Sequence, residues 1–215
     1  MYRHDRRSRV LAGLLAALAG MIDGIGFLGS GGYFVSFMSG NSTRLGVGLA
    51  ERLAAAWPAA LLIGSFVLGV VLCTLAKRRI ALFARPQSIL ACVATGISLA
   101  AMMGMWLDGL APFVLLAMAM GALNLVFEES GDIRIGLTYM TGTLVKLGSH
   151  FADGLLGSHH NRWPPFLWQW LALTSGAAVG AALFAGMGTH ALWIAALAAW
   201  MAAMLAGRVL SAKPA

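Results

Sequence analysis

Long apolar segments alternate with short polar connections along this chain. Six of these segments are long and apolar enough to cross a bilayer as helices, which takes about 20 residues; they cover 10–29, 58–76, 88–107, 110–127, 166–187 and 190–209. The composition agrees, because 60% of the residues are hydrophobic, 11% are charged and the mean hydropathy is +0.81. Too few polar residues remain to cover a water-soluble fold, so we expect an all-α integral membrane protein with six transmembrane helices.

An eleven-residue pattern occurs twice in the chain. SFMSGNSTRLG begins at Ser36 and TYMTGTLVKLG begins at Thr138, and both copies carry a cationic residue at the same place, Arg44 or Lys146. Upstream of each copy, the sequences GMID and GALN also align. We interpret the chain as a fused duplication that forms a single membrane domain over residues 1–215, with repeat one at 10–107 and repeat two at 110–209.

The topology follows from the place of the duplicated pattern between the first and second span of each repeat. A pattern that crossed the bilayer would put its cation in mid-span, at a cost of about 2.5–3.5 kcal/mol on insertion scales. We therefore predict that 34–53 and 136–156 are re-entrant, each entering and leaving on one side. Three spans per repeat then insert the second repeat upside down, as two inverted repeats. The basic N-terminus and the basic loop 77–87 would both lie on the cytoplasmic side, with the C-terminus.

Each re-entrant segment would contain a half-helix that starts near the membrane midplane. We expect Ser39-Gly40-Asn41 and Thr141-Gly142-Thr143 to cap these half-helices, whose unpaired N–H groups and positive dipole ends attract anions. The predicted substrate-binding residues are Ser39, Gly40, Asn41, Arg44, Thr141, Gly142, Thr143 and Lys146, with Asp23 and its repeat equivalent Asn124 as supporting polar residues.

Two features of this predicted site have alternative interpretations. Arg44 and Lys146 could instead be structural, each neutralised by Asp23, Glu51 or Asp153. Asp23 could exchange a proton during transport, but its null role is a buried ion pair or a hydrogen bond to the backbone of the repeated pattern.

The sequence contains no pattern that indicates catalysis. It has no nucleophile motif, phosphate-binding glycine loop or metal-ligand cluster, and its cysteines, Cys73 and Cys92, lie in hydrophobic spans. We expect no enzyme activity, no cofactor and no metal. The net charge of +7 does not indicate nucleic-acid binding, because the basic residues lie in the connections between spans. The expected partners are the lipid bilayer and a small solute, and the sequence leaves a homo-oligomer open.

The sequences GMIDGIGFL from Gly20, FVSFMSGNSTRLG from Phe34 and YMTGTLVKLG from Tyr139 resemble the bacterial YoaK-like family of six-span membrane proteins, whose function is unassigned. The chain has Ser39 where that family more often has threonine, and Leu123 where it tends to have glutamine. The resemblance implies a multi-pass protein of the bacterial inner (plasma) membrane and supplies no substrate.

Our functional hypothesis therefore depends on the site alone. We expect a channel or secondary transporter for a small anionic or polar solute, which would bind where the two re-entrant segments meet. The alternative is a non-transporting membrane scaffold or accessory subunit that has kept the fold and lost the pore.

Overall fold

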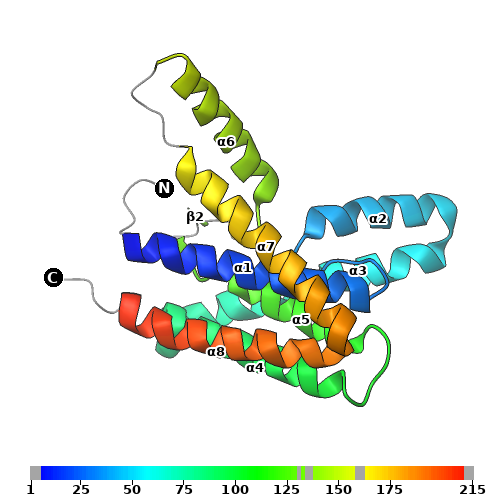
Figure 1. Ribbon diagram of the computed structural model, residues 1–215. Coiled ribbons are helices and arrows are strands. Elements are labelled where there is room, and N and C mark those ends of the chain that lie inside the picture. The colour runs from blue at the N-terminus through cyan, green and yellow to red at the C-terminus, as the bar shows by residue number, and fades with distance from the viewer. Residues whose placement is uncertain (1–5, 130–131, 134–137, 158–162, 211–215) are drawn as a thin grey trace.

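The computed structural model describes residues 6–129, 132–133, 138–157 and 163–210 (Figure 1). The described residues are almost entirely helical, with one pair of two-residue strands, β1 (Glu128–Glu129) and β2 (Asp132–Ile133). The helices are α1 (Arg6–Gly29), α2 (Met38–Glu51), α3 (Leu53–Arg79), η1 (Ala81–Ala84), α4 (Pro86–Met103), α5 (Ala111–Leu123), α6 (Met140–Leu155), α7 (Pro164–Met187), η2 (Gly188–His190) and α8 (Ala191–Leu210).

Helices occupy all six apolar segments that the sequence singled out. Among the described residues, four stretches are long and apolar enough to cross a membrane: Val10–Gly29, Leu53–Arg79, Pro86–Met103 and Pro164–Arg208. The last stretch is 45 residues long and contains both α7 and α8, which are separated by the short η2. The chain is thus a multi-pass membrane protein, as the composition predicted.

The predicted span 110–127 is a shorter helix than expected. α5 has 13 residues and ends at Leu123, because the Asn124 side chain turns back and donates to the Met120 carbonyl oxygen at 2.9 Å. The backbone then continues in tight turns, in which the Leu125 N–H donates to Ala122 and the Val126 N–H to Leu123. At 1.5 Å per residue such a helix is about 20 Å long, which is less than the hydrocarbon core of a bilayer.

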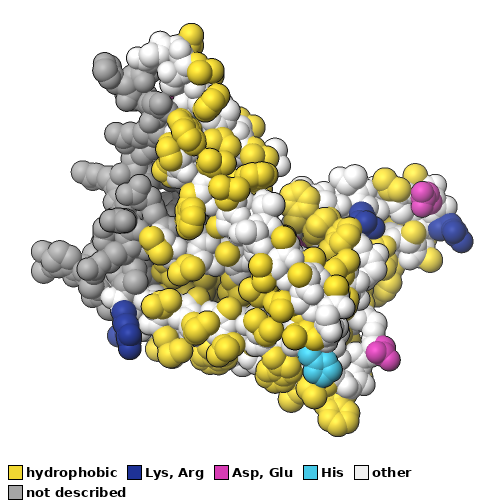
Figure 2. Space-filling view, in the orientation of Figure 1, with side chains coloured by type: hydrophobic (Ala, Val, Ile, Leu, Met, Phe, Trp, Pro, Cys, Tyr) yellow, Lys and Arg dark blue, Asp and Glu magenta, His cyan; other side chains and the backbone are white. Residues whose placement is uncertain are grey.

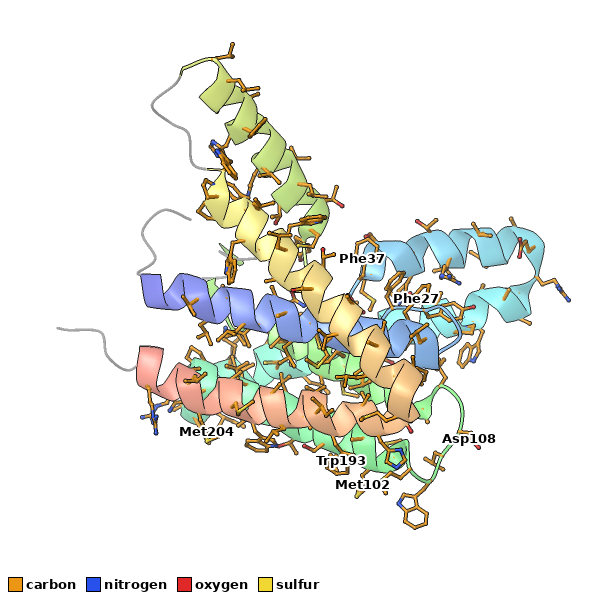
Figure 3. The ribbon with its side chains drawn as sticks, in the orientation of Figure 1. Phe27, Phe37, Met102, Asp108, Trp193 and Met204 are labelled. Atoms are coloured by element: carbon orange, nitrogen blue, oxygen red, sulfur yellow. The ribbon has the colours of Figure 1, made fainter. Side chains whose placement is uncertain are left out.

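Three helix pairs form the body of the molecule. α1 packs along α7, α3 along α5 and α4 along α8, and the buried hydrophobic core lies between them. Large side chains with almost no exposure fill this core; examples are Leu15, Ile22, Phe113, Leu116 and Met120. The outer surface is mostly hydrophobic as well (Figure 2). Trp193 and Met204 on α8, for instance, point outward and are 43% and 64% exposed (Figure 3).

The repeated pattern forms the two short helices α2 and α6. They begin close to the place where α1 and α7 cross, and from there they diverge in different directions (Figure 1). α2 packs on α3, and α6 packs on α7. Both are largely exposed, and the buried residues of α2 are only Asn41 and Gly48.

Glycines allow two of the helix pairs to approach backbone to backbone. A Cβ added to Gly20 of α1 would collide with the Leu173 carbonyl group of α7, and one added to Gly176 of α7 would collide with Ala17 of α1. In the other pair, a Cβ on Gly121 of α5 would collide with Phe66 of α3, and one on Gly69 of α3 with Met118 of α5. Small residues at such crossings are how membrane helices gain van der Waals contact, since lipid supplies no hydrophobic driving force between them.

Candidate functional site

Asp23 holds the segment that leads from α1 into α2. It lies on α1, is 8% exposed, and its Oδ1 accepts hydrogen bonds from the backbone N–H groups of Val35 and Ser36, both at 2.8 Å. Its Oδ2 accepts a hydrogen bond from the Ser36 hydroxyl. Three donors on one carboxylate are the pattern expected of its ionised form, which only accepts. Asp23 therefore fixes the start of the first copy of the pattern through charge-assisted hydrogen bonds.

A weaker contact occupies the equivalent place in the second repeat. Asn124 is 4% exposed, and its Oδ1 accepts a hydrogen bond of 3.2 Å from the Thr138 hydroxyl. Thr138 aligns with Ser36, so the same two positions touch in both repeats. The second contact is a single hydrogen bond between neutral groups, whereas the first contains three bonds to a carboxylate.

Asn41 is occupied inside the first copy of the pattern. It is 0% exposed, its Oδ1 accepts from the Phe34 N–H at 2.9 Å, and its Nδ2 donates to the Phe34 carbonyl oxygen at 2.6 Å. The side-chain amide thus holds the backbone as it turns into α2. Gly40 lies against aromatic rings, because an added Cβ would lie 2.7 Å from Phe37 and 2.9 Å from Phe34. Ser39 is exposed.

The predicted capping roles are wrong. α2 begins at Met38 with Phe37 as its cap residue, and α6 begins at Met140 with Tyr139 in that place; neither cap residue forms a side-chain hydrogen bond to its helix. The expected caps Ser39-Gly40-Asn41 and Thr141-Gly142-Thr143 therefore lie inside the first turns. The turn before each helix supplies the first acceptor instead, since the Met38 N–H donates to Ser36 and the Met140 N–H donates to Thr138.

Arg44 lies against aromatic rings. Its guanidinium carbon is 5.1 Å from the ring centroid of Tyr33 and 5.6 Å from that of Phe27. Both distances fall within the range of a cation–π interaction. Arg44 is half-buried, and its guanidinium also lies beside Gly32, where α1 has ended in two residues of positive φ.

No ion pair links Arg44 or Lys146 to a carboxylate in the part of the chain that the structure describes. Asp153 instead lies 3.6 Å from the His150 ring nitrogen, one turn away on α6. The ionic partners that the structural alternative required for the two cations are thus not observed among these residues.

The residues predicted on α6 mostly face outward. Thr141, Gly142 and Lys146 are exposed, and a Cβ on Gly142 would meet nothing within 4 Å. Thr143 is 7% exposed and donates its hydroxyl to the Tyr139 carbonyl oxygen at 3.2 Å.

A pocket of about 440 Å³ lies between the segments that lead into α2 and α6. Figure 3 labels two of its aromatic residues, Phe27 near the end of α1 and Phe37 at the start of α2. α1, α7 and the two copies of the pattern all contribute to its wall, through Asp23, Gly24, Phe27, Leu28, Phe34, Phe37, Thr138, Met140, Leu173, Ala177 and Ala181.

Only Asp23, of the ten residues predicted for the site, is among the described residues that line this pocket. The sequence had not singled out Thr138 or the phenylalanines as site residues. A signal for Thr138 was present, because Ser36 and Thr138 keep a hydroxyl at equivalent positions. The aromatic wall carried no comparable signal, since phenylalanine in an apolar segment is ordinarily a packing residue.

Comparison with known proteins gives a family and no described function. Residues 11–205 match the family model described as "Protein of unknown function (DUF1275)". The chain is also 38% identical over 199 residues to the UPF0700 transmembrane protein RA0705 of Rhizobium meliloti (strain 1021), a match that covers 90% of this chain and 85% of that relative. No solved structure matches the chain.

Proposed function

We propose a transport function for this chain, which belongs to the DUF1275 family of proteins of unknown function. That membership confirms the resemblance to the YoaK-like family, which corresponds to DUF1275. The chain would be a membrane channel or secondary transporter for a small anionic or polar solute. One observation carries the proposal: the segments that lead into the two copies of the repeated pattern line a common pocket.

The proposed architecture is a pair of inverted repeats. The contact of Gly20 with Leu173 is repeated as the contact of Gly121 with Phe66, and the two helix pairs exchange roles between the repeats. In Figure 1, α1 and its equivalent α5 run in opposite directions, which supports an upside-down second repeat. Secondary transporters of several folds place their substrate at the interface of such repeats.

The same architecture makes α2 and α6 re-entrant. They contain 14 and 16 residues, or about 21 and 24 Å at the helical rise, so neither is long enough to cross the hydrocarbon core alone. Only Arg52 separates α2 from α3, on which α2 packs. A helix that turns back at once on its neighbour supports entry and exit on one side of the membrane.

The proposed location is the bacterial inner membrane, with both termini in the cytoplasm. Gln87 at the start of α4 lies next to Gly207 at the end of α8, so the basic loop 77–87 and the end of the last helix lie on one side. The start of α1 lies on that side too (Figure 1). Basic residues gathered on one side support a cytoplasmic assignment.

The geometry favours a polar solute over an anion. The prediction of an anionic solute depended on Arg44 and Lys146, but neither is among the described residues that line the pocket. Arg44 is directed to Phe27 and Tyr33, and Lys146 is exposed on α6. An anion site at the two cations thus stays a prediction, distinct from the pocket.

A scaffold or accessory subunit is the second candidate function. It is favoured by the largely apolar wall of the pocket, in which Asp23 and Thr138 are the polar residues among those described. A protein that conducts a polar solute needs a wetted path, which an apolar wall opposes.

Solute flux in proteoliposomes tests the proposal. The purified protein would be assayed with a panel of small anions and small uncharged polar molecules, against empty liposomes. We expect flux of at least one class, and we expect Ala177→Phe, which places a ring in the pocket, to reduce it. Leu197→Phe adds the same ring at a position of α8 that is 62% exposed and serves as the matched control. Absence of flux across the whole panel would reject transport and favour the scaffold.

A further inference from the structure

The pocket has a continuous aromatic wall. The ring centroids of Phe27 and Phe34 are 4.9 Å apart, and those of Phe34 and Phe37 are 5.2 Å apart in an edge-to-face arrangement. Leu173 and Ala177 of α7 face these rings across a volume of about 440 Å³. Such a volume and lining are typical of a site for a small organic molecule that buries apolar surface.

The polar groups of the wall offer only hydrogen-bond acceptors. The hydroxyl proton of Thr138 is donated to Asn124 Oδ1, so the Thr138 oxygen faces any further partner as an acceptor. Asp23 accepts three hydrogen bonds and, as a carboxylate, has about four acceptor sites and no donor. A bound molecule must therefore supply the donor.

The charges around the pocket nearly cancel. Asp23 contributes one negative charge, and the starts of α2 and α6, represented on the wall by Phe37 and Met140, each contribute about half a positive charge from the helix dipole. No other ionisable side chain is among the described residues of the wall. A net charge near zero in an apolar site penalises an ionic ligand of either sign, because its desolvation is not repaid.

We propose that this pocket binds a small uncharged organic solute that carries a hydrogen-bond donor on an apolar body. The proposal rests on the proposed function, since it specifies the substrate class of the same site. The apolar body lies against the rings of Phe27, Phe34 and Phe37, and the donor is received by Asp23 or by the Thr138 oxygen.

Four probes with one common ring test the proposal: 4-fluorobenzyl alcohol, 4-fluorotoluene, 4-fluorobenzoate and 4-fluorobenzylamine, which is an ammonium ion at neutral pH. Their binding to the full-length protein in detergent is measured by fluorine NMR. Ala177→Phe, which fills the pocket, reports partition into detergent, and Leu197→Phe is again the control. We expect the alcohol to bind most tightly, about two- to tenfold more tightly than the toluene, as one hydrogen bond contributes about 0.5–1.5 kcal/mol.

Two variants locate the acceptor. Thr138→Val keeps the shape of the side chain and removes the hydroxyl, and Asp23→Asn replaces the carboxylate. In at least one of them the alcohol should lose its advantage over the toluene, while the toluene still binds. Thr138→Val alone decides the point if Asp23→Asn does not fold, because the wild-type ranking of the four probes stands without either variant.

The outcomes separate this proposal from transport itself. Tighter binding of the benzoate or the ammonium ion would overturn the substrate class, as would equal binding of alcohol and toluene. Equal binding to the wild type and Ala177→Phe would show that the pocket is not a site. Alcohol binding without flux of any solute would leave the substrate class standing and reject transport, whereas anion flux without alcohol binding would do the reverse.

Discussion

Gly69 and Gly176 provide a strict test of the packing between the repeats. Gly69 lies in α3 and approaches Met118 of α5, and Gly176 lies in α7 and approaches Ala17 of α1. A Cβ added to either glycine would lie 2.9 Å from the Cα of its neighbour, and it would collide with the neighbouring carbonyl group as well. The equality of the two distances predicts that Gly69→Ala and Gly176→Ala have similar effects.

The size of the effect follows from the separation that each alanine requires. Ordinary Cβ contacts begin at 3.4 Å, so the helices must move apart by at least 0.5 Å, the difference between 3.4 and 2.9 Å. A gap of about 0.5–1 Å removes a quarter to a half of the dispersion energy of the atoms that face it. Overpacking of this kind costs about 1–3 kcal/mol, which corresponds to a fall in Tm of about 2–12 °C for a chain of this length.

Thermal unfolding in detergent, followed by circular dichroism, measures the effect. Each helix supplies its own control, because a Cβ on Gly64 of α3 or on Gly186 of α7 would meet nothing within 4 Å. Gly64→Ala and Gly186→Ala should therefore leave Tm within a degree or two of the wild type. If Gly69→Ala and Gly176→Ala are no more destabilising than these controls, the close approach does not exist. If only one of them is destabilising, the two crossings are not equivalent.

Three further predictions follow from the contacts of the repeated pattern. Asp23→Asn should lower Tm clearly, since it replaces the charged acceptor of three hydrogen bonds, each of which contributes about 1.5–3 kcal/mol; an unchanged Tm would contradict the clamp. Arg44→Met should cost only about 0.5–1 kcal/mol, the value of an exposed cation–π interaction, and Lys146→Met less. Rescue of an unstable Arg44→Met protein by Asp23→Asn would reinstate the ion pair. Cysteines at Gly31 and Ala54 should both be labelled from outside the cell, and labelling from opposite sides would mean that α2 crosses the membrane.

Hydropathy was sufficient to locate the membrane helices, but their ends depended on local hydrogen bonds. α5 stops at Leu123, four residues before the predicted end of its span, because Asn124 bonds back to Met120. α2 starts one residue before the predicted cap, because the Met38 N–H is satisfied by the preceding turn. Such bonds depend on the rotamer of one side chain or on one backbone turn, and neither affects the average hydrophobicity of a segment.

The sequence alignment found the equivalent positions but not what they contact. It paired Asp23 with Asn124 and Ser36 with Thr138, and the structure shows that each repeat joins its two members by a hydrogen bond. The direction of Arg44 was not predictable from the pattern, because Phe27 and Tyr33 lie outside it. The roles of the eight predicted substrate-binding residues stay predictions.

The meeting of the two copies of the pattern at one pocket is the central claim. It is tested most directly by cross-linking in native membranes, with cysteines placed at Phe37 and Met140, one from each copy, after Cys73 and Cys92 have been replaced by alanine. A short bismaleimide should join the two cysteines within one chain in high yield, and much less in a control that pairs Phe37→Cys with Leu155→Cys at the far end of α6. Equal yields in the two variants, or no cross-link in either, would contradict the shared pocket.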